Sequence, residues 1–482
     1  MSFAIQSTIP VYQHRVLCGG CFDKQLRIDA LQAEVERLRQ ELSQTKRKKK
    51  KMQKEGVFGS STPSSLKPHK ENSEDENKKK RGGGKKGHKG HGREKHEKDS
   101  IDRVIELQMP EQCPDCNTPL EAHDQRERVV IDAVRLEVEK LLYKYGRGAC
   151  PKCNKNFSPV ISAVLPQFLY GNELLAQVAV MHYVHGVSLG KIFEMLGPAV
   201  KSAGVIGCLS RLSCLFEPTV TKLISDYRET HVRHADESVW RTDGSSGYVW
   251  IFCTKGISIY EFQNTRSARV VAKILGTTPL GGVLVVDRYA GYNKAPCGLQ
   301  YCFAHILRKV EDLAEEFEGN GAVDDFTDQL IPLLSTSQGL RGLPISDREY
   351  YLKAEALKKQ IQKLMDVDYD HLGVDEIQDL FLKKEERLFR WVKDREIPCE
   401  NNFAERQARI PVLARKVSFG SQSELGAKMR GRWMSVLHTV RLRVPSKEEV
   451  LPWLKNTLDE VVRNPKTNIY DLLPPLPRAH SP

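Results

Sequence analysis

No apolar stretch of this 482-residue sequence approaches the roughly 20 residues that a helix needs to cross a bilayer. The start also lacks the charged and then apolar segments of a secretory leader. We therefore expect a soluble, intracellular protein with no membrane partner. The twelve cysteines are not spaced like a disulfide framework, which favours a reducing compartment such as the cytoplasm.

The excess positive charge is confined to one segment. The formal charge is +12, and Lys46 to Lys98 contains nineteen Lys or Arg and seven Asp or Glu, so this segment alone accounts for it. Its Lys, Gly, Ser, Asn and His residues predict disorder in the unbound state. Such a tail is typical of proteins that bind a polyanion, above all nucleic acid; a solubilising linker is the alternative.

Before this segment, five apolar residues recur at spacings of 3, 4, 3 and 4: Ile28, Leu31, Val35, Leu38 and Leu42. This is the a/d pattern of a short coiled coil. The helix can either dimerise or pack on the rest of the chain.

Two C-x-x-C motifs give the strongest local signal: Cys113 with Cys116, and Cys150 with Cys153. Four thiolates at this spacing can hold one structural Zn²⁺ tetrahedrally, which leaves no position open for a substrate. The interval between the pairs is long for a zinc ribbon, and a predicted hairpin of strands 128–134 and 136–145 explains its length.

From residue 231 the pattern changes to short runs rich in Val, Ile, Tyr and Phe, which predict five strands: His231–Asp236, Tyr248–Cys253, Ile257–Phe262, Val283–Asp287 and Gln300–Ala304. Tight connections predict that the first three form antiparallel hairpins, and a helix is expected over Ser267–Leu275. Helical spacing precedes the strands, as a helix-turn-helix-like bundle or as plain core helices, and follows them from Ile306. Ser446 and Glu449 form a capping box near the end.

Two carboxylates lie where strands are predicted to end. Asp236 closes the first predicted strand and Asp287 the fourth, so both side chains are expected at the edge of a sheet. Glu237 and Asp243 are competing carboxylates near Asp236. Asp287 can instead be a helix N-cap.

A third carboxylate follows a pair of asparagines. Asn401 or Asn402 can cap a helix that has Glu405 in its first turns. Glu405 can alternatively form only a surface ion pair with Arg409 at i, i+4.

Several motifs resemble, in order and spacing, the bacterial transposases of the insertion sequence 66 family. They are Ala235-Asp-Glu-Ser, Gly247-Tyr-Val-Trp, Val286-Asp-Arg-Tyr-Ala-Gly-Tyr, Cys302-Phe-Ala-His-Ile-Leu-Arg-Lys, Asn401-Asn-Phe-Ala-Glu-Arg and Arg415-Lys-Val-Ser-Phe-Gly-Ser. The resemblance extends from about Val16 to Leu473. Two positions depart from the family: Glu400 stands where Asp is common, which makes it a minor rival ligand, and Phe303 replaces the usual Trp.

The resemblance implies an RNase H-like α/β core whose DDE triad, Asp236, Asp287 and Glu405, holds two Mg²⁺ ions, with Mn²⁺ as a substitute. Carboxylates suit these hard ions, and two ions can stabilise both the entering and the leaving oxygen of a phosphate. The implied reaction is hydrolysis at the ends of a mobile element, followed by transesterification of the 3′-hydroxyl into target DNA. The implied partners are both DNAs, other copies of the chain and accessory proteins of the element, in the bacterial cytoplasm at the nucleoid.

Basic residues near Glu405 are candidate phosphate contacts, although surface arginines without this role would look the same: Arg406, Arg409, Arg415, Lys416, Arg430 and Arg432. His305 is either close to the reacting phosphate or structural. A catalytically silent DNA-binding protein descended from a transposase, and a nuclease with the same core but no strand transfer, are the alternative functions.

The sequence thus predicts a multidomain α+β protein with the following parts: an N-terminal helix or short coiled coil (1–45), a basic linker (46–100), a zinc-binding module (101–166), a helical, helix-turn-helix-like domain (167–229), the RNase H-like core (230–305 and 395–440), a helical insertion (306–394) and a C-terminal helix and tail (441–482).

Overall fold

The computed structural model describes residues 138–144, 148–149, 156–157 and 160–477. The predicted coiled coil, the basic linker and the four predicted zinc ligands, Cys113, Cys116, Cys150 and Cys153, lie outside these residues. Two short strands, β1 (Gly148–Ala149) and β2 (Asn156–Phe157), pair antiparallel. The strand predicted over 136–145 is wrong in its described part, because residues 138–144 have no hydrogen-bonded neighbour strand among the described residues and form neither helix nor strand.

The remaining description concerns one compact unit, which contains residues 160–192 and 202–477; residues 138–144 and 193–201 belong to a second unit. The centre of the first unit is a five-stranded sheet of β3 (Val232–Thr242), β4 (Ser245–Thr254), β5 (Ile257–Gln263), β6 (Val283–Val286) and β7 (Gly298–Tyr301). The strand order is β5-β4-β3-β6-β7, in which β3, β4 and β5 are antiparallel neighbours. Strand β6 pairs parallel with both β3 and β7. The five predicted strands and their hairpins are therefore confirmed.

Two predicted strand ends are wrong. Strand β3 continues six residues beyond Asp236, because the turn to β4 lies at Asp243 and Gly244, whose positive φ angles of 50° and 71° suit a type I′ hairpin. Strand β7 ends at Tyr301, and helix α8 (Phe303–Glu316) begins where the last predicted strand was still running.

Helices account for most of the other described residues. Those before the sheet are α3 (Asn172–Ala179), the π-helix η3 (Val180–Val184), α4 (Leu189–Leu196), α5 (Ser202–Leu215) and α6 (Glu217–Glu229). The insertion after β7 comprises α8, α9 (Gly321–Leu340), α10 (Asp347–Met365), α11 (Leu372–Lys383), α12 (Glu385–Leu388) and α13 (Arg390–Lys393). The last helices are α14 (Asn402–Ser418), α15 (Glu424–Arg443), η5 (Lys447–Glu449), α16 (Val450–Arg463) and η6 (Ile469–Leu472). The capping box of Ser446 and Glu449 is present.

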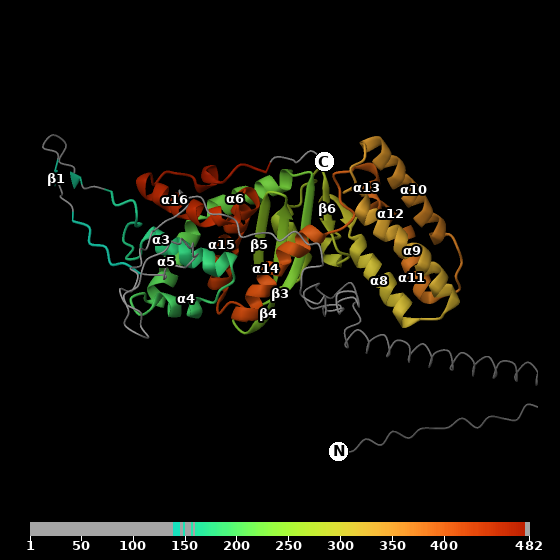
Figure 1. Ribbon diagram of the computed structural model, residues 1–482, viewed down its shortest axis with the longest axis horizontal. Helices are drawn as coiled ribbons and strands as arrows, with labels where there is room; N and C mark the ends of the chain where they lie inside the picture. The colour runs from blue at the N-terminus through green and yellow to red at the C-terminus, as the bar shows by residue number, and fades with distance from the viewer. Residues whose placement is uncertain (1–137, 145–147, 150–155, 158–159, 478–482) are drawn as a thin grey trace, which may run out of the picture. The chain divides into compact units, whose positions relative to one another are not determined.

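Different helices cover the two faces of the sheet. Helix α7 (Ala268–Leu275) and α6 supply Ile274 and Tyr227 to a large apolar core that includes Ala235 of β3. Helix α14 packs against β3 and β4, where His234 contacts Phe403. Because side chains alternate along a strand, Asp236 shares the α14 face with His234. Figure 1 shows the sheet between the insertion helices and the last helices of the chain.

Both edges of the sheet are covered. On β5, the backbone N–H groups of Ser258 and Tyr260 donate to Thr439 and Ser435 of α15. Four residues of helix rise about 6 Å and two residues of strand about 6.8 Å, so hydroxyls at i and i+4 match alternate strand residues. On β7, Gln300 donates to the carbonyl of Leu388 at 3.0 Å. Neither edge strand is left open to pair with another chain.

The helices before the sheet pack on α15. Trp433 stacks on Tyr183 with ring centroids 5.5 Å apart, and Phe216 packs edge-on against it. Trp433 also donates to the carbonyl of Leu209. This bundle therefore shares its core with the C-terminal helices, and a helix-turn-helix role in reading DNA stays an interpretation.

Candidate active site

The parallel pairing of β3 and β6 brings Asp236 and Asp287 together. The register pairs His234 with Val285, so two further residues along each strand set Asp236 beside Asp287. Asp236 is only 5% exposed and Asp287 7%. The prediction that Asp236 closes a strand is wrong, because Asp236 is inside β3; it nevertheless lies level with the point where β6 stops.

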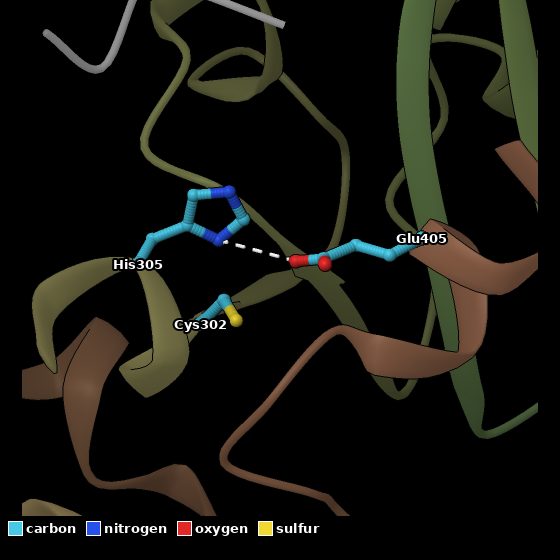
Figure 2. Close-up of side chains that lie close together, drawn as sticks. All are labelled: Cys302, His305 and Glu405. Atoms are coloured by element: carbon cyan, nitrogen blue, oxygen red, sulfur yellow. Dashed lines mark ion pairs between the residues drawn. The ribbon is translucent and has the colours of Figure 1, made fainter. Parts of the chain in front are cut away.

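Glu405 reaches the same region from α14. It lies in the first turn of the helix, whose axis crosses the face of β3. Its carboxylate forms ion pairs with two residues of α8: Arg308 at 3.3 Å and the Nδ1 atom of His305 at 3.6 Å. Figure 2 shows His305 pointing toward Glu405 from the neighbouring helix. Among the described residues, the ion-pair partners of Glu405 are thus on α8, and the surface pair with Arg409 is not formed.

The charges of nearby carboxylates act on Asp236. Burial raises the pKa of Asp236 well above its usual range, and repulsion from Glu237, Asp287 and Glu405 raises it further. The N–H of Glu237 donates to Asp236 at 2.9 Å and opposes this shift. A positive ion among these oxygens would relieve the repulsion.

The competing carboxylates are otherwise engaged. Glu237 points to the opposite face of β3, where Arg266 and the Tyr292 hydroxyl both donate to it. Asp243 lies in the hairpin turn, seven residues or about 23 Å along β3 from Asp236. Of the two glutamates, Glu405 is among the charges with the largest effect on the pKa of Asp236. Glu405 is therefore the better placed of the two glutamates.

Asp287 has a local role, but the predicted alternative of a helix N-cap is wrong, because Tyr289 is the N-cap of the short helix η4 (Ala290–Tyr292). The Oδ1 atom of Asp287 accepts from the Tyr289 N–H at 2.9 Å, which closes the turn after β6. One carboxylate oxygen of Asp287 thereby fixes the turn, and its role as a metal ligand stays a prediction.

Asn401 holds the site together, in a way the sequence reasoning missed. The residue is the N-cap of α14, but its side chain does not cap the helix. It is 1% exposed, donates to the Ala235 carbonyl at 2.8 Å and accepts from His234 Nδ1 at 3.0 Å. Its own N–H donates to Cys302 Sγ at 3.1 Å. Asn401 thus joins the strand of Asp236, the helix of Glu405 and the start of α8.

Cys302 and His305 form a small cluster with Glu405. One possible ligand atom from each lies within 4.8 Å of the others. Burial, followed by the charge of Glu405, raises the pKa of the Cys302 thiol to about 12. Cys302 therefore acts as a neutral acceptor for the Asn401 N–H. Arg308 was not predicted as a site residue, although it belongs to the motif Cys302-Phe-Ala-His-Ile-Leu-Arg-Lys and lies three residues after His305.

The candidate phosphate contacts divide into two groups. Arg406, Arg409 and Lys416 are exposed on α14. The other three have partners within the chain: Arg415 donates to the Val239 carbonyl, Arg430 is 6% exposed and bonds His182, and the partly exposed Arg432 pairs with Glu217. The prediction is wrong for Arg430, because its guanidinium lies between the rings of Tyr183 and Trp240.

This arrangement defines a class of site: acidic groups converging at the end of parallel strands, with basic residues beside them. Carboxylate oxygens of this kind suit a hard divalent cation. None of the described helices is long and apolar enough to cross a membrane.

The sequence profile of the family described as "Transposase IS66 family" matches residues 167–429, which is 263 of the 482 residues. The chain therefore belongs to the IS66 transposase family. It is also 24% identical over 230 residues to a protein of Sinorhizobium fredii (strain NBRC 101917 / NGR234) that is described as "Uncharacterized protein y4hP". That match covers 40% of this chain and 39% of the relative's length.

Proposed function

We propose that this chain is an active DDE transposase with an RNase H-like core, in which Asp236, Asp287 and Glu405 bind two Mg²⁺ ions. The observation that carries the proposal is the convergence of three carboxylates from β3, the end of β6 and α14. The charges of Asp287 and Glu405 both raise the pKa of Asp236. The five-stranded mixed sheet supports the core that the family resemblance implies.

The residues present fit such ions. The three acids supply only oxygen ligands, and their mutual repulsion needs a compensating positive charge. When bound, two magnesium or manganese ions would stabilise the charge that develops on the entering and leaving oxygens of a DNA phosphate.

The protein's own residues have distinct parts in this proposal. Asp236 and Asp287 are rigid ligands, since one is inside a strand and the other closes a turn. Glu405 is the adjustable ligand, because its partners Arg308 and His305 are side chains that can move away. After that movement, the guanidinium of Arg308 is close enough to the acids to contact a DNA phosphate.

DNA is the proposed partner, both as the ends of the mobile element and as the target. The basic linker and a zinc module at Cys113, Cys116, Cys150 and Cys153 remain predictions that would add DNA contacts and a structural Zn²⁺. Further copies of this chain and accessory proteins of the same element are also proposed partners.

Strand transfer of labelled element-end DNA in Mg²⁺ tests the proposal. The variants are Asp287→Asn and Glu405→Gln, and the matched control is Asp243→Asn, which changes an acid in the distant hairpin turn. We expect joined product from the wild type and the control, and none from the other two variants. Binding of Mn²⁺, followed by calorimetry, should weaken at least tenfold in the same two variants and stay unchanged in the control.

Three outcomes would change the conclusion. Hydrolysis without joined DNA would indicate a nuclease. Tight DNA binding without cleavage, together with absent Mn²⁺ binding, would indicate a silent DNA-binding protein. Full activity of Asp287→Asn would remove the proposed ligand set.

A further inference from the structure

One exposed strip of α14 combines basic and apolar side chains. It consists of Arg406, Arg409, Leu413, Lys416 and Val417, and it ends at Phe419 just beyond the helix. The spacings of 3 and 4 place these residues on one side of the helix. Leu413 is 61% exposed, although apolar residues of this size are usually covered. We call this the α14 strip.

Phe419, at the end of the α14 strip, is exposed and has a backbone conformation that does not suit a bulky residue. Its side chain is 78% exposed and its φ angle is +60°, in the left-handed region that disfavours bulky residues. Its N–H closes the end of α14 on the Arg415 carbonyl at 2.7 Å. Glycine would make the same helix end without strain, so the turn itself does not require an aromatic ring there.

The turn that carries Phe419 is fixed to the sheet. Ser421 donates through its N–H to the Arg241 carbonyl at 2.9 Å, and its carbonyl accepts from Asp243 at 2.9 Å. The Trp240 indole donates to the Ser421 hydroxyl at 3.1 Å. The ring of Phe419 is therefore held outward on a rigid support rather than on a loose loop.

The charge of the strip indicates its partner. Helix α14 has one acid, Glu405, and the residues of the strip are cationic or apolar. Cationic side chains bind the phosphates of DNA, and aromatic side chains can stack on bases or enter a base step. A protein partner would need acids to match the three cations, whereas DNA offers phosphates and apolar base faces together.

The end of the strip also lies at a defined distance from the proposed active site. Phe419 is fourteen residues beyond Glu405, which is about 21 Å along the helix axis. Base pairs rise about 3.4 Å, so this length corresponds to about six base pairs. We infer that the α14 strip is a DNA-binding track, and that Phe419 packs against bases about six base pairs from the phosphate at Glu405. This inference rests on the proposed function, because the base pairs are counted from the phosphate that is proposed to lie at Glu405.

The test uses the full chain, in EDTA so that no chemistry occurs, with element-end duplexes that carry 2-aminopurine at successive positions. Phe419→Gly relieves the strained conformation, so its melting temperature should equal or exceed that of the wild type. We expect this variant to bind the duplex about tenfold more weakly, and to lose the fluorescence change near the sixth base pair. Phe419→Trp should keep both. Leu372→Ala, which removes an apolar residue that is 85% exposed at the start of α11, is the matched control.

Salt dependence separates the two kinds of contact. Arg409→Ala and Lys416→Ala should each reduce the slope of log affinity against log salt by about 0.9, whereas Phe419→Gly should leave the slope unchanged. Unchanged DNA binding by Phe419→Gly would overturn the inference. A change of oligomeric state in that variant, with DNA binding intact, would overturn it in favour of a protein interface.

Failure here and failure of the proposed function give different results. If the strip does not bind DNA, Mn²⁺ binding and strand transfer would still depend on Asp287 and Glu405. If the chain is a silent binder, the Phe419 signals would remain while cleavage and Mn²⁺ binding were absent.

Discussion

At the scale of single residues, Asn401 decides how the acids meet. The side chain of a helix N-cap residue usually accepts a hydrogen bond from an N–H group in the first turn of its own helix. Asn401 instead bonds His234 and Ala235, the two residues before Asp236. The amide has both a donor and an acceptor, which a carboxylate at this buried position would not offer. This explains why an asparagine is at the junction between strand and helix.

Asn401→Ala should lower the free energy of unfolding by about 2–4 kcal/mol, because the buried His234 N–H and Ala235 carbonyl would lose their partners. Urea unfolding followed by tryptophan fluorescence measures the loss. Asn402→Ala is the matched control, since Asn402 has no side-chain hydrogen bond within the described part of the chain. Equal stability of the two variants would contradict the role given to Asn401.

At the scale of elements, α14 contains a proline that a helix interior usually excludes. Pro411 has no N–H, so the carbonyl of Gln407 loses its partner in the helix. The Tyr260 hydroxyl of β5 lies 3.4 Å from this carbonyl and from the side-chain oxygen of the same residue. The strand therefore satisfies the group that the proline frees, and this contact helps to hold the helix of Glu405 on the sheet.

Tyr260→Phe should destabilise the protein by about 1–2 kcal/mol, because the buried Gln407 carbonyl is then left without a donor. In a Pro411→Ala background the helix can supply its own N–H, so the same substitution should cost about 1 kcal/mol less. A double-mutant cycle of urea unfolding measures this coupling. Additive effects would mean that the Tyr260 hydroxyl does not replace the hydrogen bond that Pro411 removes from the Gln407 carbonyl.

The contact between α15 and β5 depends on a glycine. A Cβ atom at Gly431 would lie 2.8 Å from the Tyr260 carbonyl oxygen, so the helix would have to move away from the strand that it covers. Gly431→Ala should therefore cost about 1–3 kcal/mol despite the better helix propensity of alanine. Gly207→Ala in α5, where a Cβ meets open space, should instead stabilise by about 0.5–1 kcal/mol. Thermal unfolding of the two variants should thus shift in opposite directions.

At the scale of the whole molecule, buried histidines should make the fold sensitive to acid. Burial lowers the pKa of His182 and His234 to about 4 and that of His438 to about 3. Each pKa is lower in the folded state than the usual 6.5 of the unfolded state. Their contribution is therefore complete above about pH 6.5, and it is lost as the pH falls toward 4.

His438→Gln tests this sensitivity. Below about pH 6.5, each such histidine adds a slope of about 1.4 kcal/mol per pH unit to the free energy of unfolding. The variant should lose one such slope between about pH 6 and pH 4.5, whatever its stability at neutral pH. The raised pKa of Asp236 acts in the opposite direction but is common to both proteins, so it cancels in the comparison. If the plots of unfolding free energy against pH were parallel for the wild type and the variant, the lowered pKa of His438 would be contradicted.

The sequence by itself determined where the strands and the insertion helices lie, and it selected the acids of the proposed site. Short runs rich in Val, Ile, Tyr and Phe located the five strands, and helical spacing located the insertion. The ordered motifs then selected Asp236, Asp287 and Glu405, which composition alone could not distinguish from ordinary turn and surface carboxylates. The sequence did not reveal that β3 continues past Asp236, because the residues after Asp236 are compatible both with the end of a strand and with its continuation into a hairpin.

Only the tertiary structure decided how these residues are used. The parallel register of β3 and β6 put two acids side by side although they are 51 positions apart in the chain. Residues far apart in the chain became partners: Asn401 bonds the strand of Asp236, Arg308 pairs with Glu405, and Arg266 pairs with Glu237. They also buried Arg430, which the sequence presented as one more surface cation. Local spacing cannot predict such partners, because they depend on which elements pack together and on the angle at which they meet.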